Sequence, residues 1–407
     1  MIKNNKSLAL FGGAPISRKK IPLYLPTIEG DDVEAVSKAV ASTFVSGDGP
    51  ECRKFEDELS EYLGVKHVFF TTSCTAALDL AFMIKNFPPG SEVIVPNFTF
   101  TSTALAPILN NLKVVLVDID PLTGNIDVSQ IEENITDKTV AIVPVDYAGY
   151  PADMDAINEI AQRHKLYVVQ DSAQSIGAKY KGRKTGKFAD ITCFSFHGTK
   201  NLICGEGGAI ATDQDDLVEK IKIMREKGTD KHGYLSDPLK KGYYEYVDKG
   251  NSYVQSNILG ALGRSQLKKL DRLNARRAAI AQKYIDNLKN IPNITLRPEH
   301  ECYESNWHLF YILVNPDDKA IILEALDKEG VGVNIHYSPL HINSYYNRIC
   351  QFDRNRLKGS NNFFNKLIRI PMYPGLSDVE VDKVIAAVIK VCASLSADTL
   401  RGKYVSL

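Results

Sequence analysis

Apolar residues recur along the chain with two different periods, and the change of period separates the predicted elements. Between residues 30 and 63 the pattern is typical of two amphipathic helices, and Val33, Val36 and Val40 share one face of the first helix. From residue 67 onward, short apolar runs alternate with helical stretches. This alternation predicts a mainly parallel β-sheet that is covered by helices on both faces.

The predicted strands are short apolar runs that are bounded by polar or turn-forming residues. They lie at residues 67–72, 92–95, 113–117, 140–145, 166–170, 191–194 and 208–212. The helices between them are predicted at residues 75–85, 101–109, 128–134 and 154–164.

The length of 407 residues exceeds what one hydrophobic core usually supports, so two domains are expected. A long helix near residues 257–288 is placed to connect them, and beyond it residues 309–314 and 331–335 have the pattern of strands. We therefore predict that residues 1–270 form an N-terminal segment and a large domain. Residues 271–407 are predicted to form a smaller C-terminal α+β domain.

Charge and cysteine content exclude several classes of partner and site. Lysine plus arginine and aspartate plus glutamate both count 49, so no basic excess points to nucleic acid or to an anionic membrane. No apolar run approaches the roughly 20 residues that span a bilayer. The seven cysteines include no Cys-x-x-Cys pair, which argues against a disulfide framework or a zinc site. We expect a cytoplasmic protein with buried thiols and without a bound metal.

Unusual residues follow two of the predicted strands, at the sheet edge where ligands bind in open α/β folds. Ser73, Cys74 and Thr75 open a helix after the first strand, so they form either a phosphate site at the helix N-terminus or simply a helix cap. Asp171 ends a buried apolar strand, where a carboxylate needs a cationic partner or hydrogen bonds. A pyridinium nitrogen would be such a partner, and a capping role is the alternative.

The segment from residue 193 to residue 208 is the most informative part of the sequence. It places Lys200 in a loop between two apolar strands, near Ser195 and His197, and the glycines that follow allow close backbone approach. Together with the phosphate site and the aspartate, this lysine suggests a cofactor that carries a phosphate and a nitrogen heterocycle. No Gly-x-Gly-x-x-Gly turn joins a strand to a helix, and no P-loop is present.

Nine segments in this order resemble the sugar aminotransferases of the DegT/DnrJ/EryC1/StrS group over nearly the whole chain. They are PTIEGDDVEAV, FVSGDGPECRKFEDEL, SCTAALDLA, PNFTFTST, DSAQSIGAKYKGRKTG, SFHGTKNLICGEGGAI, REKGTD, GNSY and VNIHYSPLH. The resemblance implies the fold-type I architecture of pyridoxal 5'-phosphate (PLP) enzymes, which is aspartate-aminotransferase-like, with a mostly parallel mixed sheet between helices and a smaller C-terminal α+β domain. Within the group, SCTAAL, REKGTD and HYSPLH look most like dTDP-4-keto-6-deoxyglucose 4-aminotransferases.

The resemblance also implies roles for individual residues. Lys200 corresponds to the residue that holds PLP as a Schiff base and moves the substrate proton, and Asp171 to the partner of the pyridine nitrogen, which keeps the ring an electron sink. The remaining cofactor contacts carried over are Ser73, Cys74, Thr75 and Ser195 for the phosphate, Phe100 for the ring face, Gln174 for the ring hydroxyl, and Ser252 for the phosphate of the partner subunit.

His336 and Asn201 are the residues that the resemblance assigns to the substrate. The sequence departs from the group in places: Ser252 stands where Asn is frequent, and Asp146 stands where many relatives carry His, so no role is assigned to Asp146. The neighbouring Asn251 is an alternative to Ser252.

The function that follows is transamination of a nucleotide-linked keto sugar in a homodimer with shared active sites. The expected reaction converts a dTDP-4-keto-6-deoxyhexose to the 4-amino sugar with L-glutamate as donor, for cell-surface polysaccharide or lipopolysaccharide synthesis such as that of O-antigen. The alternatives are a 3-keto sugar, a UDP- or GDP-linked 4-keto sugar, a PLP-dependent sugar dehydratase, a non-catalytic regulator, and an amino-acid aminotransferase. The dehydratase relatives replace the Schiff-base lysine with histidine, whereas Lys200 is present here.

Overall fold

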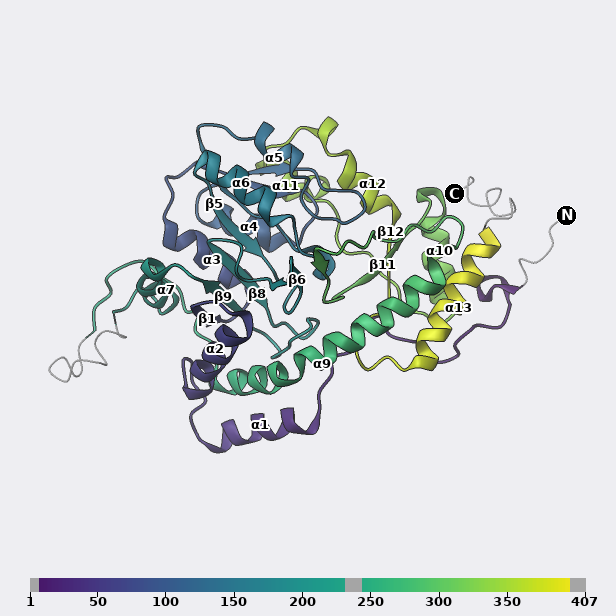
Figure 1. Cartoon of the computed structure of the whole chain (residues 1–407), viewed down its shortest axis with the longest axis horizontal. Coiled ribbons are helices and arrows are strands. Elements are labelled where there is room, and N and C mark those ends of the chain that lie inside the picture. Colours follow the sequence, from purple (N-terminus) through teal and green to yellow (C-terminus); the bar gives the residue numbers. More distant parts are fainter. Residues whose placement is uncertain (1–6, 231–243, 396–407) are drawn as a thin grey trace.

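The computed structural model describes residues 7–230 and 244–395, which form two domains joined by the long helix α9 (Asn257–Leu288) (Figure 1). The helix begins at a cap in which the side chain of Ser256 accepts a hydrogen bond from the N–H of Ile258. Its first half packs on the larger domain and its second half on the smaller one. The predicted domain boundary at residue 270 lies inside this helix, and the predicted ranges end at residues 1 and 407, which lie outside the described residues.

A seven-stranded sheet with the order β1-β9-β8-β5-β4-β2-β3 forms the centre of the larger domain. Its strands are β1 (His67–Thr71), β2 (Glu92–Pro96), β3 (Lys113–Val117), β4 (Thr139–Ile142), β5 (Tyr167–Asp171), β8 (Ile191–Ser195) and β9 (Gly208–Thr212). Neighbouring strands from β3 to β8 pair in parallel, and β9 runs antiparallel to both β1 and β8. The predicted mostly parallel mixed sheet is confirmed.

Helices cover both faces of this sheet because successive strand residues point to opposite sides. Phe69 of β1 packs with one set of helices and Phe70 with the other. One face is covered by α3 (Cys74–Lys85), α4 (Thr101–Leu109) and α7 (Val218–Arg225). The other face is covered by α2 (Pro50–Leu63), α5 (Ser129–Glu133), α6 (Met154–His164) and α9. A small sheet of β6 (Lys179–Tyr180), β7 (Arg183–Lys184) and β10 (Tyr303–Glu304) lies beside it.

The smaller domain has its own core around the antiparallel pair of strands β11 and β12. Its elements are β11 (Phe310–Leu313), α10 (Lys319–Lys328), α11 (Ser344–Ile349), α12 (Lys358–Lys366), β12 (Leu367–Ile370) and α13 (Asp378–Leu395). The first residues of the chain belong here as well, because Leu8 and Ile21 are buried in this core and the N–H of Ile21 donates to the carbonyl of Gly330 at 2.8 Å. The prediction that the N-terminal segment belongs with the large domain is therefore wrong for these residues.

The predicted strand at residues 331–335 is also wrong. Two isolated bridges replace it: Val331 pairs with Ile21, and Asn334 pairs with Arg369 of β12. A Cβ atom at Gly332 would lie 2.8 Å from the backbone nitrogen of Leu23. The N-terminal segment therefore occupies the space beside residues 331–335 in which a regular strand partner would lie.

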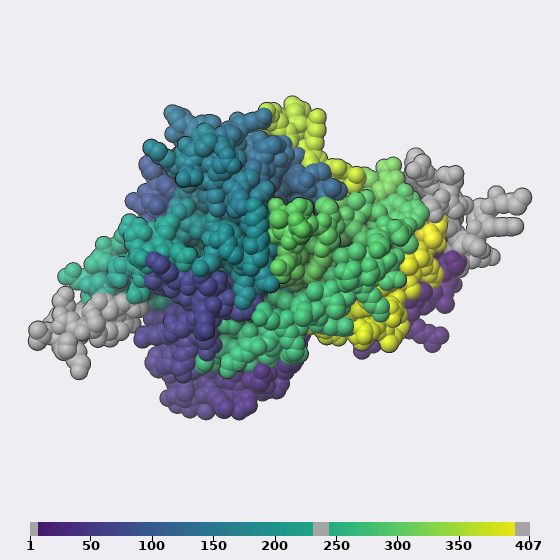
Figure 2. Space-filling view, in the orientation of Figure 1, coloured from purple at the N-terminus to yellow at the C-terminus, as the bar shows by residue number. Residues whose placement is uncertain are grey.

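Helix α1 (Gly30–Ala41) packs with its polar side inward. Asp32 is buried and lies 3.0 Å from the ammonium group of Lys269 on α9, whereas Val33 and Val40 are 58% and 50% exposed. The predicted apolar face therefore exists, but it points away from the molecule. In Figure 2 the purple atoms of this region lie at the lower edge of the molecule, below the green atoms.

Candidate functional site

The sequence-predicted residues converge at one edge of the large sheet. Strands β1, β5 and β8 run in the same direction, and β9 begins where they end. A cavity of about 370 Å³ opens at this edge, and we call it the large cavity. Nine predicted site residues line it: Ser73, Cys74, Thr75, Phe100, Asp171, Gln174, Ser195, Lys200 and His336.

The N-terminus of α3 forms one wall of the large cavity. Ser73 is the helix cap, and its hydroxyl accepts a hydrogen bond from the N–H of Ala76 at 3.0 Å. The N–H groups of Cys74 and Thr75 come before the hydrogen-bond ladder of the helix, so they remain available at its positive end. The capping role is confirmed, and it leaves these N–H groups free, so the anion site stays a prediction that is compatible with the cap.

Gly208 brings this helix terminus close to the end of β8. It pairs with Thr71 of β1 on one side and with Ser195 of β8 on the other. A Cβ atom at this position would lie 2.3 Å from the carbonyl carbon of Ser73. Only glycine permits such an approach, and the predicted close contact of backbones after Lys200 is confirmed here.

Asp171 lies at the end of β5 and is only 4% exposed. Its carboxylate accepts hydrogen bonds from the hydroxyl of Thr103 at 2.7 Å and from the N–H of Ala173 at 3.1 Å. It forms no ion pair with any side chain in the described part of the chain, and burial raises its pKa. A cationic group in the large cavity would supply the missing partner.

Lys200 reaches the cavity from the loop between β8 and β9. The loop is closed by hydrogen bonds from the N–H of Lys200 to the carbonyl of His197 at 2.9 Å and from the N–H of Gly198 to the carbonyl of Gly205 at 2.8 Å. Burial of the amine lowers the pKa of Lys200, while the nearby Asp171 acts in the opposite direction. A lowered pKa increases the fraction of neutral amine, which is the nucleophilic and basic form.

Tyr337 is a cavity residue that the sequence analysis missed. Its hydroxyl accepts a hydrogen bond from Nε2 of Gln174 at 2.8 Å, and its ring lies 5.7 Å from that of Phe100. The carbonyl of the Gln174 amide accepts from the N–H of Ala148 at 2.7 Å. Gln174 is thus held at both ends, and Phe100, half exposed, faces the cavity. The position of Tyr337 directly after His336 in HYSPLH was the available signal.

These features fit PLP. The free N–H groups of α3 suit a phosphate, the buried carboxylate of Asp171 suits a protonated ring nitrogen, and the amine of Lys200 suits an aldehyde. Among the described residues, no cluster of three or more histidine, cysteine, aspartate or glutamate side chains could hold a metal ion.

Asp146, to which the sequence gave no role, is a fully buried acceptor that braces the turn after β5. Its carboxylate accepts from the hydroxyls of Ser172 and Ser175 at 2.7 and 2.6 Å and from Nε2 of Gln170 at 3.0 Å. Its N–H donates to the carbonyl of Asp171 at 3.1 Å. The residue therefore fixes the backbone that carries Asp171.

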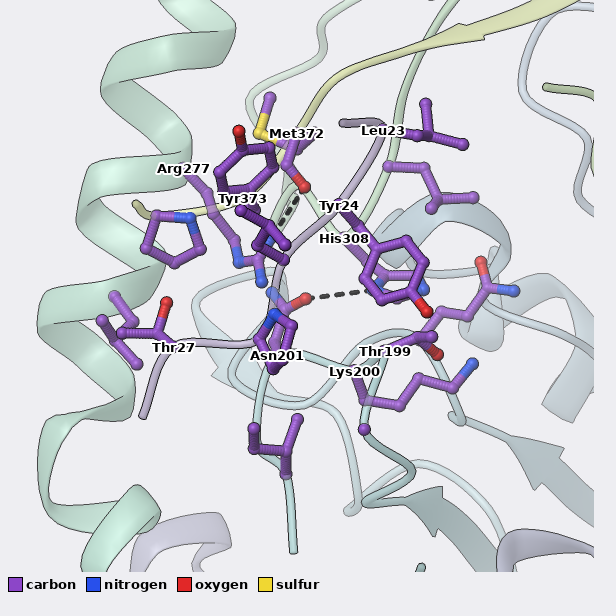
Figure 3. A pocket seen from close by; sticks show the side chains of 18 of the residues that line it. Leu23, Tyr24, Thr27, Thr199, Lys200, Asn201, Arg277, His308, Met372 and Tyr373 are labelled. Atoms are coloured by element: carbon purple, nitrogen blue, oxygen red, sulfur yellow. Dashed lines mark hydrogen bonds between the residues drawn. The ribbon is translucent and has the colours of Figure 1, made fainter. Parts of the chain in front are cut away.

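A second cavity, of about 130 Å³, adjoins Lys200 on the side of the smaller domain (Figure 3). Asn201 lines it, but its side chain is bound within the protein: Nδ2 donates to Asn274 at 2.8 Å and to the carbonyl of Asn306 at 2.9 Å, and Oδ1 accepts from Nδ1 of His308 at 3.1 Å. Asn201 holds the His308 ring in place. The structure thus gives no free amide for the predicted substrate contact, which stays a prediction.

His336 lines both cavities, and its Nδ1 accepts a hydrogen bond from Nη1 of Arg369. Burial, together with the Arg369 cation, lowers the pKa of His336 to about 4. The imidazole is therefore neutral at physiological pH. Since Nδ1 accepts, the proton of the neutral ring resides on Nε2, which can donate to a ligand.

Ser252 lines neither cavity of its own chain. It lies exposed in the segment before α9, where it forms a bridge with Glu226, and its N–H donates to Asn251 Oδ1 at 2.8 Å. Its contact with a partner subunit stays a prediction.

None of the helices in the described ranges is long and apolar enough to cross a membrane.

The chain is similar to known proteins over most of its length. The sequence profile of the DegT/DnrJ/EryC1/StrS aminotransferase family matches residues 26–389. The spore coat polysaccharide biosynthesis protein SpsC of Bacillus subtilis (strain 168) is 36% identical over 376 residues, which are 90% of this chain and 96% of that protein.

Two solved structures are similar over nearly their whole length. PseC of Helicobacter pylori, described as an aminotransferase involved in the biosynthesis of pseudoaminic acid, superposes with a TM-score of 0.86 at 30% identity, covering 92% of this chain and 100% of that chain. Spr1654 of Streptococcus pneumoniae, in its PMP form, superposes with a TM-score of 0.87 at 28% identity, covering 92% of this chain and 100% of that chain. A PLP form of Spr1654 is also similar to this chain.

Proposed function

Because the chain belongs to the DegT/DnrJ/EryC1/StrS aminotransferase family, we propose that it aminates a dTDP-linked 4-keto-6-deoxyhexose at carbon 4, with L-glutamate as the amino donor. Sugar aminotransferases of this family are PLP-dependent transaminases with the fold-type I architecture, so the enzyme class, cofactor and fold follow from membership. The sugar, the nucleotide and the donor are the proposed parts.

One observation carries the proposal: the amine of Lys200, the carboxylate of Asp171 and the free end of α3 face one cavity of about 370 Å³. Each group alone has an ordinary structural explanation. Their convergence supports a phosphate site, a ring-nitrogen partner and a nucleophilic amine around one ligand. Retention of both Lys200 and Asp171 favours transamination over dehydration or a non-catalytic role.

The residues of this chain divide the chemical work among them. When bound, PLP supplies an electron sink for the charge that remains on carbon after proton removal. Asp171 keeps the ring nitrogen protonated by charge pairing, and Thr103 and Ala173 hold that carboxylate in place. Nζ of Lys200 takes the α-proton of the donor and, in the second half of the reaction, delivers a proton to the sugar carbon.

Support for the sugar comes from the segment around His336. His336 and Tyr337 line both cavities from the smaller domain, so they can contact a bulky ligand that reaches Lys200 from outside. The nucleotide offers binding energy remote from the reacting carbon, which helps to orient that carbon. SCTAAL and REKGTD favour the 4-amino branch, whereas the catalytic residues are shared with the 3-keto and UDP- or GDP-linked alternatives.

A homodimer with shared active sites is part of the proposal. Helix α1 exposes Val33 and Val40, and the segment after it exposes Phe44 and Val45, at 44% to 58% of their surface. Exposed apolar side chains at such nearby positions of the chain are consistent with a subunit interface. A catalytic dimer should bury about 2,000 Å² or more. Sedimentation of dilute active enzyme as a monomer would contradict this part.

The biological setting is proposed from two observations. SpsC, a relative at 36% identity, is named for spore coat polysaccharide biosynthesis, which supports a role in making an amino sugar for a surface polysaccharide. All seven cysteines are unpaired thiols, which is typical of a reducing compartment such as the cytoplasm.

The test is a panel assay with the PLP-loaded protein and L-glutamate. The acceptors are dTDP-linked 4-keto and 3-keto 6-deoxyhexoses and the UDP- and GDP-linked 4-keto sugars, and products are identified by mass and NMR. The proposal predicts the highest kcat/KM for the dTDP 4-keto sugar. A preference for a 3-keto sugar or another nucleotide would overturn the substrate assignment, and loss of water from the sugar without amination would overturn the reaction.

A further inference from the structure

The smaller cavity beside Lys200 has an unusual charge balance. We call it the arginine pocket and define it by Lys200, Arg277, His308, His336 and Arg369. It is enclosed by α9, the N-terminal segment of residues 23–27 and the Lys200 loop (Figure 3). No aspartate or glutamate among the described residues lines it. A ligand in this pocket therefore meets only positive or neutral groups.

Its two arginines are buried without a carboxylate partner. Arg277 and Arg369 are 5% and 9% exposed, and neither pairs with an acidic side chain in residues 7–230 or 244–395. Arg277 donates from Nη1 to the carbonyl of Met372 at 3.2 Å, and Arg369 donates to His336. Among the described residues the Nε atom of each has no hydrogen-bond partner, which is also true of two other buried arginines. The feature that sets Arg277 and Arg369 apart is therefore the missing carboxylate.

Two other buried arginines of the chain show what a structural role looks like. Arg225 pairs with Glu56 at 2.5 Å and with Asp48 at 3.1 Å, and Arg297 pairs with Glu299 at 3.1 Å. Burial of an uncompensated charge is costly, so a buried arginine normally has such a counter-ion. The missing counter-ions in the arginine pocket indicate an anionic ligand.

The size and position of the pocket indicate which class of anion it binds. A volume of about 130 Å³ is far below that of a pocket for a drug-sized ligand, so it suits a small molecule and not a nucleotide sugar. A guanidinium binds a carboxylate through two parallel hydrogen bonds. Two such groups in one pocket with Lys200, of which Arg369 is close enough to lower the pKa of the Lys200 amine, match a small molecule with two carboxylates and an amino group.

We propose that the arginine pocket binds the dicarboxylic amino donor, with Arg277 and Arg369 as the anchors of its carboxylates. The inference rests on the proposed transamination, because it assigns a place to the donor of that reaction. His336 is then a positioning residue: its Nδ1 directs the Arg369 guanidinium, and the neutral state of its ring allows it to accept that hydrogen bond. Burial lowers the pKa of Arg277 to about 9, which still leaves the group charged at neutral pH.

The test is equilibrium binding of glutarate to the PLP-loaded protein by calorimetry. Glutarate has both carboxylates and no amine, so it cannot react. Variants R369M and R277M should weaken it by about 30-fold or more, because each removes a buried charged partner. R276Q is the matched control, since Arg276 neighbours Arg277 on α9 but pairs with Asp378 at 2.9 Å and does not line the pocket; it should change affinity less than about twofold.

Two further measurements test the alternative roles of the arginines, which are binding of a diphosphate and stabilisation of the fold. dTDP and inorganic pyrophosphate are titrated into the same variants: if R369M and R277M weaken these ligands and leave glutarate unchanged, the arginines hold the diphosphate of the sugar nucleotide and the proposal is overturned. Thermal unfolding tests a structural role. Glutarate should raise the Tm of the wild type but not that of R369M, and ligand-free R369M should melt at or above the wild-type temperature.

R369K keeps the charge but loses the paired N–H donors of the guanidinium group. It should therefore fold like the wild type and bind glutarate more weakly. Undiminished glutarate binding in both R369K and R277M would contradict the proposal. Failure of this inference is distinct from failure of the proposed function. If the protein aminates a sugar with a donor that has no second carboxylate, the assignment of the arginine pocket is wrong but the proposed function stands. If the protein binds glutarate tightly but aminates no sugar, the proposed function is wrong but the arginine pocket still binds a dicarboxylate.

Discussion

The large cavity and the arginine pocket share Lys200 but are built from different parts of the chain and have different charge. The large cavity is formed at the carboxyl ends of β1, β5 and β8, and its main ligand groups are the end of α3 and the carboxylate of Asp171. The arginine pocket uses α9, β12 and the N-terminal segment, and none of the described residues that line it carries a carboxylate. One cavity thus suits a phosphate and a protonated ring, and the other suits carboxylates.

The difference indicates how the work is divided between the domains. The residues that we propose to hold the cofactor lie on the large domain, whereas Arg277 and Arg369 approach from the second half of α9 and from the smaller domain. A donor that reaches Lys200 therefore lies between the two domains. The following changes test whether the two cavities act separately, beginning with the change that affects both.

Replacement of Lys200 by alanine should have the largest effect. The variant loses the amine that binds the cofactor covalently and moves the proton, so turnover should fall by about 10³-fold or more. PLP should still bind, without a covalent bond, through α3 and Asp171. Formation of 2-oxoglutarate from glutamate measures the loss. Lys184→Ala is the control, because that amine lies over the ring of Tyr62 at 3.4 Å, outside both cavities; turnover in Lys200→Ala equal to that of the control would refute the assignment.

Asp171→Asn should affect only the large cavity. It keeps the shape of the side chain and removes the charge, so turnover should fall by about 10²- to 10³-fold while glutarate binding in the arginine pocket stays the same. Since burial of Asp171 without an ion-pair partner raises its pKa, the neutral variant should melt no lower than the cofactor-free wild type. Unchanged turnover would mean that another group partners the ring nitrogen.

Asn201→Ala should affect the arginine pocket to a smaller degree. Loss of the hydrogen bond to His308 frees that ring at the pocket wall, so the KM for glutamate should rise about fivefold, as for one lost hydrogen bond. The KM for the sugar should not change. Steady-state kinetics with each substrate varied in turn distinguishes the roles: a rise in the sugar KM alone would favour the direct substrate contact that the sequence implied.

His336→Asn should have the smallest effect, on the pH dependence of stability. The folded pKa of about 4 lies below the ordinary value of 6.5, so the unfolded chain binds a proton at His336 between these values that the folded chain does not. This part of the stability is present above pH 6.5 and is lost as pH falls toward 4. The Tm of the variant should therefore fall less than that of the wild type between pH 6.5 and 4.5. His300→Asn, at an exposed position near Tyr303, serves as the control; identical acid profiles for all three proteins would contradict the prediction.

The large cavity could be predicted from the sequence because its parts are local. Ser73, Asp171 and Lys200 each follow a strand whose apolar pattern is clear, and parallel strands bring such ends to one edge without further information. The residue types alone indicate two of its features: a serine hydroxyl can cap a helix, as Ser73 does, and a glycine permits close backbone approach, as Gly208 does.

The arginine pocket could not be predicted in this way, because Arg277 and Arg369 are 92 residues apart and meet only through the packing of the smaller domain. An arginine inside the apolar strand LIRI of β12 was nevertheless a signal of the same kind as Asp171 at the end of β5. The predicted strand at residues 331–335 failed for a related reason: the N-terminal segment pairs with it, and no local pattern records a partner 310 positions away along the chain.

Lys200, at the junction of the two cavities, is proposed to be the cofactor lysine. The most direct measurement is to incubate the protein with PLP, reduce it with borohydride, digest it and locate the added pyridoxyl phosphate mass by tandem mass spectrometry. We predict one modification per chain, on Lys200, which disappears when excess glutamate converts the bound cofactor before reduction. Modification of a different lysine, or modification of Lys200 that glutamate does not prevent, would contradict the assignment of Lys200.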